Sequence, residues 1–216
     1  MTTDAYRTLA KCYDALFEPA LHHAKLLGLE LWPPKEGMQV LDIGCGTGSQ
    51  LQLYRNSGCS VFGVDRSPSM IEEARRKLGN EAVLDLANGD ALPCASSSFD
   101  LVLLSMTLHE LSEGGRSGIL DEVKRVLKRE GKALVLDYHP GPLSFPRGWL
   151  ARPLILLVER VAGREHCQNY RGFISSGGVP QLADRHKFLI EEERIIKGGN
   201  FGLFLLSIGK RTDAGN

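Results

Sequence analysis

Residues 40–50 read VLDIGCGTGSQ and are the most informative about the fold. The segment Gln39–Ile43 is mainly apolar and predicts a buried strand. A glycine-rich turn follows, and then a short helix to about residue 56. Outward from this unit, the same alternation of apolar runs and amphipathic segments predicts further strands at Ser60–Asp65, 81–87, Phe99–Ser105 and 132–138.

The connections between these strands predict helices. Ser67-Pro68 places an N-cap serine before a proline at the first helical position. Apolar residues line one side of 116–128. Near the end, FLIEEERII and NFGLFLLSIG flank Lys197-Gly198-Gly199, a hairpin signal that predicts an antiparallel edge to the sheet. The predicted fold is therefore α/β: a Rossmann-like, doubly wound, mostly parallel seven-stranded sheet with a C-terminal antiparallel hairpin.

The 216 residues are expected to form a single domain with four parts. Residues 1–36 are an N-terminal helical cover, since apolar residues recur at helical spacing from 4 to 31 and Pro33-Pro34 end the pattern. Residues 37–139 are a cofactor-binding core. Residues 140–180 break the alternation and are predicted to cover a substrate site, and 181–216 hold a terminal helix and the hairpin.

Composition excludes several classes of protein. With 26 basic and 26 acidic residues the net charge is zero, so no basic field attracts nucleic acid. The N-terminus lacks an apolar signal core and no apolar run approaches the ~20 residues that span a bilayer, so we expect a cytoplasmic protein. Five scattered cysteines without a C-x-x-C pair, and histidines without ligand spacing, predict neither disulfides nor a metal site.

The glycine turn distinguishes between two kinds of nucleotide site. Gly44, Gly46 and Gly48 allow a sharp turn and close approach of the backbone to a ligand. A nicotinamide dinucleotide site has the pattern G-x-G-x-x-G, but Ser49 occupies the sixth position here. Asp42 adds a second distinction, because an acid before the turn can receive a cationic amino group but would repel a pyrophosphate.

Two further acids follow the next two strands. Asp65 closes the second strand, about 20 residues after the turn, where a carboxylate can accept hydrogen bonds from both ribose hydroxyls. Asp90 follows the third strand, where it can accept from an adenine amino group while Ala91 offers its backbone N–H. The alternatives are a structural acceptor at Asp42, an aspartate approaching a helix at Asp65 and a turn aspartate at Asp90.

The motifs DIGCGTGSQ, VDRSPSMIEEAR and NGDALPCASSSFDLVLLS, in this order and spacing, resemble the class I S-adenosylmethionine (SAM)-dependent methyltransferases. The similarity is greatest to the type 11, ubiquinone/menaquinone-biosynthesis-like branch, and it spans about residues 39–137. It implies that the three glycines line the methionine part of SAM and that Asp65, with Arg66 beside it, holds the ribose. Met70 would pack under the adenine, Asp90 and Ala91 would hold its edge, and Ser105 would approach from the fourth strand. It also implies that Tyr13 closes over the cofactor, unless this tyrosine only fills the helix core.

The acceptor and any catalytic base are less well defined by the sequence. Quinone-ring members of the branch carry an Arg-Asn pair after the fourth strand, whereas this chain has Ser105-Met106-Thr107-Leu108-His109. His109, Tyr138 and His139 follow strands four and five and are the candidate general bases. They alternatively cap a helix or shape the pocket. Methyl transfer itself mainly requires alignment of the reactants and exclusion of water.

The segment 140–180 suggests the class of acceptor. Trp149, Leu150 and Leu154 are among its apolar residues, and arginines flank the run. This composition fits a peripheral membrane contact and a small, hydrophobic or lipid-like acceptor, and it equally fits a helix docked on the domain or a homodimer contact. Both a monomer and a homodimer remain open. The alternative function is a non-catalytic SAM-binding partner or sensor module with the same fold.

Overall fold

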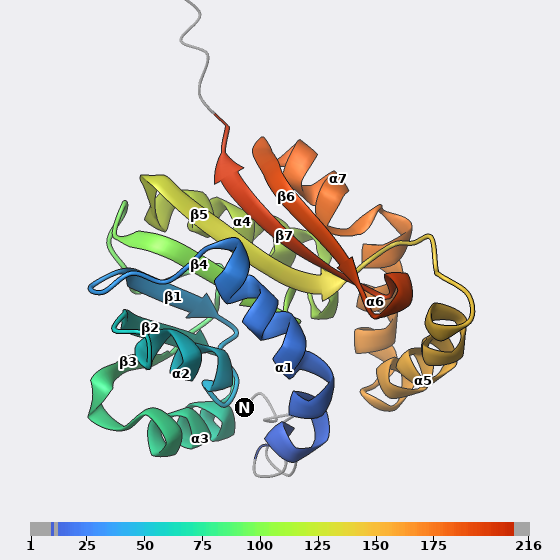
Figure 1. Ribbon diagram of the computed structural model, residues 1–216, viewed down its shortest axis with the longest axis horizontal. Coiled ribbons are helices and arrows are strands. Elements are labelled where there is room, and N and C mark those ends of the chain that lie inside the picture. The colour runs from blue at the N-terminus through green and yellow to red at the C-terminus, as the bar shows by residue number, and fades with distance from the viewer. Residues whose placement is uncertain (1–9, 11–12, 210–216) are drawn as a thin grey trace, which may run out of the picture.

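The computed structural model describes residue 10 and residues 13–209, which form one seven-stranded sheet with helices on both faces (Figure 1). The strands are β1 Gln39–Ile43, β2 Ser60–Asp65, β3 Ala82–Leu86, β4 Phe99–Ser105, β5 Leu127–Tyr138, β6 Phe188–Ile196 and β7 Phe201–Ile208. The α-helices are α1 Tyr13–Leu31, α2 Ser49–Arg55, α3 Pro68–Leu78, α4 Glu113–Val126, α5 Arg147–Val161, α6 Arg164–Ser175 and α7 Gly178–Arg185. Short 3₁₀ turns are η2 Gly79–Glu81, η3 Leu108–Glu110 and η4 Lys197–Gly199.

The strand order is β3-β2-β1-β4-β5-β7-β6. Strands β1 to β5 pair in parallel, and β1 pairs with both β2 and β4. The order therefore reverses at β1, which makes the carboxyl ends of β1 and β4 the topological switch point where ligands bind in open α/β sheets. The predicted doubly wound, mostly parallel fold is confirmed.

The alternation of side chains along β1 divides the core into two layers. Leu41 and Ile43 pack in the layer covered by α4, α6 and α7, and Val40 packs in the layer covered by α1, α2 and α3. In Figure 1, α1 crosses in front of the sheet and α4 lies behind it. Asp42 shares its face with Val40 because successive side chains of a strand point to opposite sides. The carboxylate thus lies on the α1 side of the sheet.

The C-terminal hairpin is present, but its place in the sheet is more specific than expected. β7 runs antiparallel to both of its neighbours, so it is inserted between β5 and β6, and β6 rather than β7 forms the edge. The burial pattern explains this order. Six consecutive residues of β7 are buried, whereas most of β6 is exposed. A strand with two buried faces is stable inside a sheet, and a charged one tolerates the edge.

Two other boundaries differ from the sequence expectation. The helix expected at 116–128 begins at Glu113, where the Ser112 hydroxyl accepts a hydrogen bond from Gly115 N, and ends at Val126. β5 begins at Leu127 rather than at 132, because Leu127 pairs with Phe99 before an irregularity in the register. The cap predicted at Ser67 is confirmed, with Pro68 as the first residue of α3.

The expected cover, residues 140–180, consists of α5, α6 and the start of α7. Figure 1 shows α5 at the periphery, beyond the carboxyl end of β5. None of the described helices has both the length and the apolar character needed to cross a membrane.

Candidate active site

The glycine-rich turn joins β1 to α2 at the switch point. Gly44, Gly46 and Gly48 have φ angles of 77°, 53° and 75°, in the region that side chains disfavour. A Cβ at Gly44 would stand 2.7 Å from Thr107 Oγ1, and one at Gly48 would stand 2.8 Å from Leu78 Cδ1. A Cβ at Gly46 would meet nothing within 4 Å. Two of the glycines therefore permit close packing, and the third keeps space open beside the turn.

Asp65 connects this turn to the start of α3. Its Oδ2 accepts a hydrogen bond from Gly46 N at 2.9 Å, and its Oδ1 accepts one from Ser67 N at 2.8 Å. Burial raises the pKa of Asp65 above its ordinary value, and these backbone donors partly offset that rise. The carboxylate is thereby fixed in orientation at the end of β2.

A pocket of about 280 Å³ opens along the carboxyl ends of the strands. Eight of the residues expected at the cofactor line it: Tyr13, Gly44, Gly46, Asp65, Arg66, Met70, Asp90 and Ser105. Sequence reasoning did not single out other lining residues, including Thr107, Glu110 and Leu111. These residues lie in or near η3, directly after β4. Their position just beyond the carboxyl end of a predicted strand could have identified them as pocket residues.

Three expected cofactor residues do not border the pocket. Gly48 packs against α3. The backbone N–H of Ala91 donates to Asn88 O at 3.2 Å. Asp42 is buried on the α1 side of the sheet, and its Oδ1 has no hydrogen-bond partner. Burial raises the pKa of Asp42 to about 7, although Lys25 acts to lower it.

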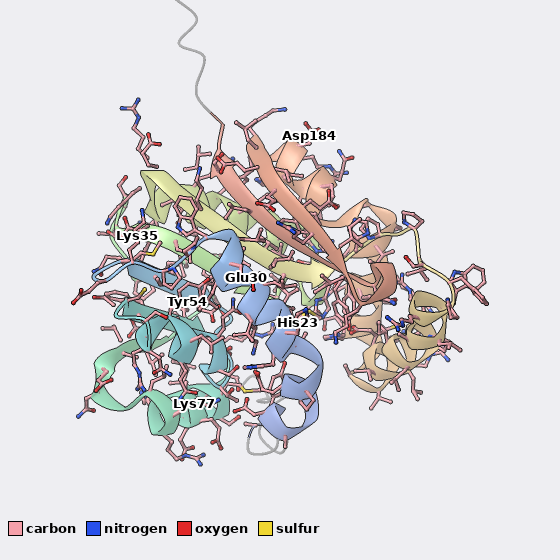
Figure 2. All side chains as sticks on the ribbon, in the orientation of Figure 1. His23, Glu30, Lys35, Tyr54, Lys77 and Asp184 are labelled. Atoms are coloured by element: carbon pink, nitrogen blue, oxygen red, sulfur yellow. The ribbon has the colours of Figure 1, made fainter. Side chains whose placement is uncertain are left out.

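Polar side chains hold α1 against the glycine turn. Thr47 Oγ1 donates to Asp14 Oδ1 at 2.5 Å, and Lys77 pairs with the same carboxylate. Further along α1, the buried Lys25 donates to Ser49 Oγ at 2.6 Å. Figure 2 labels Lys77 on α3, across from the first turns of α1. Residue 13, at the start of α1, is thus held over the pocket.

The candidate general bases lie outside the pocket lining and are engaged in other contacts. His109 Nδ1 lies 2.8 Å from Asp137 Oδ1. Burial acts to lower the pKa of His109, but Asp137 and, more weakly, Glu110 and Glu159 together raise it to about 9. The Tyr138 hydroxyl donates to Glu159 Oε1 at 2.7 Å, and His139 Nε2 lies 3.0 Å from Glu193 Oε1. A catalytic role for the three residues stays a prediction.

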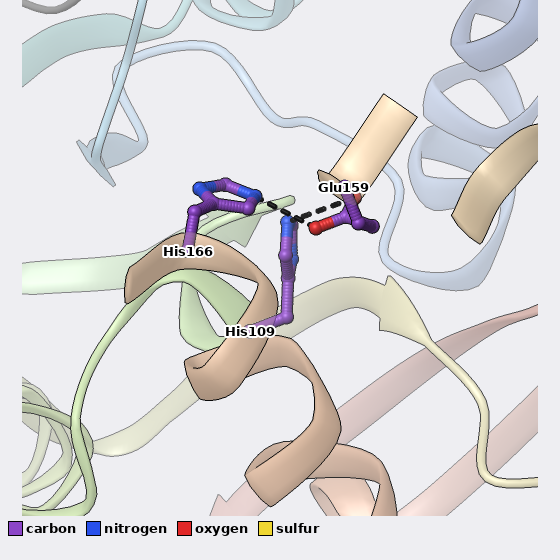
Figure 3. Close-up of side chains that lie close together, drawn as sticks. All are labelled: His109, Glu159 and His166. Carbon is purple, nitrogen blue, oxygen red and sulfur yellow. Dashed lines mark ion pairs between the residues drawn. The ribbon is translucent and has the colours of Figure 1, made fainter. Parts of the chain in front are cut away.

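His109 also belongs to a cluster that sequence spacing did not reveal. Glu159 from α5 and His166 from α6 meet it beside the carboxyl end of β4 (Figure 3). Dozens of residues separate His109 from the other two members, so neither a shared helix face nor a short motif links them. The described cysteines, Cys45, Cys59, Cys94 and Cys167, are all free, while Cys12 lies outside the described residues.

A Rossmann-like sheet with a glycine turn and an oriented carboxylate at its switch point defines an α/β protein that binds a nucleotide-containing cofactor. The family described as "Methyltransferase domain" matches residues 41–135. An uncharacterized methyltransferase of Synechocystis sp. is 32% identical over 183 residues, which cover 85% of this chain and 80% of the relative. The chain belongs to the class I SAM-dependent methyltransferases, in the ubiquinone/menaquinone-biosynthesis-like branch, and SAM is its cofactor.

Other similarities cover less of the relative or concern the fold alone. A demethylmenaquinone methyltransferase of Clavibacter sepedonicus is 34% identical over 116 residues, 53% of this chain and 46% of that protein. The PH0226 protein of Pyrococcus horikoshii has a TM-score of 0.67 at 19% identity, covering 94% and 96% of the two chains. The 1,6-didemethyltoxoflavin-N1-methyltransferase of Burkholderia thailandensis, solved with S-adenosylhomocysteine, has a TM-score of 0.63 at 16% identity, covering 89% and 79%. The chain thus spans just under half of the quinone-pathway relative.

Proposed function

We propose that this methyltransferase holds SAM along the carboxyl ends of β1, β2 and β4 and transfers its methyl group to a small, lipid-like acceptor at a membrane surface. The proposal has two parts, the cofactor contacts and the acceptor class. The outward apolar face of α5 carries the second part.

The side chains at the pocket fit the polar groups of SAM. Asp65 is oriented by two backbone donors and keeps lone pairs for ribose hydroxyls. Asp90 lies at the rim and Met70 is buried at the wall, which suits the edge and the face of an adenine. Asp42 does not border the pocket, so it would act on the amino group of the methionine moiety only through its charge.

Bound SAM supplies a sulfonium methyl group that transfers by in-line displacement, so the protein's task is alignment and exclusion of water. Gly46 keeps open the space next to Asp65, and α1 closes the pocket from the front through its contacts with the turn. Tyr13, at the start of that helix, borders the same pocket. The chain's own residues thus enclose the cofactor between the turn, β4 and α1.

Helix α5 places two polar side chains, one glycine and Ile155 on its inward side, and most of its apolar side chains point outward. The stripe that faces the protein has positions 148, 152, 155 and 159, and two of its members are Arg152 and the buried Glu159. The opposite stripe repeats at i, i+4, i+7 and i+11, and its members Leu150, Leu154, Leu157 and Val161 are 76%, 63%, 56% and 79% exposed. The wide apolar stripe therefore faces away from the domain, whereas a helix that only covers its own core turns such a stripe inward.

The charges around this stripe favour a lipid surface as its occupant. Exposed Trp149 and Phe145 extend the apolar area at one end of α5. Arg147, Arg160 and Arg164 are exposed at the two ends. A helix with apolar residues on one side and arginines at the border of that side binds membranes that contain anionic lipids. Glu159, on the inward side of the same helix, contacts Tyr138 at the end of β5, so α5 lies beside the ligand edge of the sheet while its apolar face is turned away from the protein.

Vesicle flotation tests the acceptor class. We expect the protein to bind vesicles of phosphatidylcholine with phosphatidylglycerol, and to bind pure phosphatidylcholine more weakly. The double variant Leu150→Ser/Leu154→Ser should lose about tenfold or more in affinity. The matched control is Leu189→Ser/Ile195→Ser, which removes exposed apolar side chains from β6 instead. Equal loss in both variants, or no binding of the wild type to anionic vesicles at low salt, would reject the lipid-surface proposal.

SAM binding, measured by calorimetry on the same variants, separates the two parts of the proposal. The α5 variant should bind SAM as the wild type does, because α5 lies outside the pocket lining. Transfer of a labelled methyl group into lipid extract should fall in that variant only. Loss of SAM affinity in the α5 variant would contradict this separation.

A further inference from the structure

The three residues of the cluster come from separate parts of the chain and converge at one point (Figure 3). His109 lies in η3, Glu159 in the last turns of α5 and His166 in the first turn of α6. One potential ligand atom from each lies within 4.8 Å of the other two. The side chains of His109 and Glu159 are almost completely buried, and that of His166 is 18% exposed.

The two distances inside the cluster lie on either side of the spacing between ligand atoms in a zinc site. His166 Nε2 lies 2.7 Å from Glu159 Oε2, and His109 Nε2 lies 3.9 Å from Glu159 Oε1. Around a tetrahedral zinc ion with bonds of about 2.0–2.1 Å, ligand atoms stand roughly 3.3 Å apart. The two imidazole rings are 5.5 Å apart between centroids and inclined by 78°.

One carboxylate oxygen in this cluster has only an imidazole opposite it. Glu159 Oε1 accepts from the Tyr138 hydroxyl, whereas Oε2 is buried and faces His166 Nε2 at ion-pair distance without a well-directed hydrogen bond. A cation between Oε2 and Nε2 would bind both atoms.

A carboxylate lies behind the His109 imidazole, as it does behind many metal-binding histidines. Its Nδ1 faces Asp137 Oδ1 at 2.8 Å, which leaves Nε2 directed toward the cluster. Asp137 is itself fixed, because Oδ2 accepts from Leu108 N at 2.9 Å. A carboxylate behind the imidazole sets its tautomer and raises its basicity as a ligand.

From these contacts we propose that His109, Glu159 and His166 bind one divalent transition-metal ion of the zinc class. Two imidazoles and one carboxylate form a ligand set that suits zinc and related ions. The ion joins η3, α5 and α6 and holds the two cover helices against the end of β4. The pocket lining includes none of the three ligands, so the ion acts as a structural clamp and leaves the methyl-transfer site as described.

Metal titration of chelator-treated, full-length protein tests the proposal without reference to activity. We expect calorimetry with Zn²⁺ to show one equivalent bound, and Co²⁺ to give the visible absorption of a site with few ligands. His166→Ala and Glu159→Gln should each weaken Zn²⁺ binding by about tenfold or more. Zn²⁺ should raise the thermal midpoint of the wild type and leave that of His166→Ala unchanged.

Two matched variants remove metal-binding groups outside the cluster. His23→Ala deletes an exposed histidine of α1, labelled in Figure 2. Cys167→Ser deletes a free thiol adjacent to His166. Both should bind Zn²⁺ as the wild type does. If Glu159→Gln fails to fold, His166→Ala tests the proposal alone, because His166 is partly exposed and its loss should be tolerated. SAM binding by this variant reports that its core is intact. Wild-type affinity in His166→Ala, an equal loss in His23→Ala or Cys167→Ser, or no stoichiometric binding to the wild type would overturn the proposal.

Discussion

Asp65 Oδ2 accepts a hydrogen bond from Gly46 N at 2.9 Å, so the end of one strand fixes the turn that follows its neighbour. β1 and β2 pair in parallel, and their carboxyl ends meet at the same edge of the sheet. This one hydrogen bond orients the carboxylate of Asp65 and fixes the backbone of the glycine turn. Substitutions at these two positions therefore test the cofactor site most directly.

Asp65→Ala removes both the oriented carboxylate and the acceptor for two backbone donors. We expect SAM affinity to fall at least tenfold, about 1.4 kcal/mol, in calorimetry. Glu36→Ala removes an exposed acid that precedes the start of β1, at the opposite end of that strand from the glycine turn, and should retain wild-type affinity. NADH, as a control ligand, should bind neither protein. A wild-type SAM affinity in Asp65→Ala would remove this residue from the proposed site.

Gly46→Ala and Gly37→Ala form a matched pair. Both glycines have positive φ angles (53° and 75°), and a Cβ at either would meet nothing within 4 Å. Each substitution should cost about 1–2 kcal/mol of unfolding free energy through backbone strain. SAM affinity should fall only in Gly46→Ala, because Gly46 borders the pocket. The two variants are compared by urea unfolding and by SAM titration, and equal SAM affinities would count against the pocket as the cofactor site.

Asp42 predicts a pH dependence of stability. Its pKa is about 7 in the folded protein against 3.8 ordinarily, chiefly because of burial, so the folded chain binds this proton more tightly than the unfolded chain does. The stabilisation from Asp42 is therefore fully present below about pH 4 and is lost as the pH rises toward about 7.

Asp42→Asn keeps the position neutral at every pH. Relative to this variant, the wild type should lose on the order of 2–4 kcal/mol of unfolding free energy between about pH 4 and pH 8. Urea unfolding of both proteins across this range measures the difference. A difference that does not change with pH would show that Asp42 is ionised in both states.

Thr47→Val tests whether α1 closes the pocket. The substitution keeps the shape of the buried side chain but removes the oxygen that contacts Asp14 and Lys77. We expect a loss of about 1–2 kcal/mol in unfolding free energy and faster dissociation of SAM in stopped-flow experiments. Ser57→Ala, which removes an exposed hydroxyl that follows α2 and donates to Leu53 O, provides the comparison. An unchanged dissociation rate would show that α1 does not retain the cofactor.

The sequence predicted the strands that are mainly apolar, including β1, β2 and β4 with their observed bounds. It also predicted the Ser67 cap and the turn at Lys197–Gly199. Local patterns suffice for these features, because periodicity and turn chemistry act over a few residues. The start of β5 and the insertion of β7 depend on pairing partners from distant parts of the chain, which no local pattern specifies.

The same division holds for the sites. Local sequence specifies the class of fold, the glycine turn and the acids in or shortly after the first three strands, because each lies at a fixed offset from a strand end. The packing of separate elements sets the side of the sheet on which Asp42 lies, the outward direction of the apolar stripe of α5, and the meeting of His109, Glu159 and His166. Those outcomes depend on how separate elements pack, and packing is set by contacts between residues far apart in the chain.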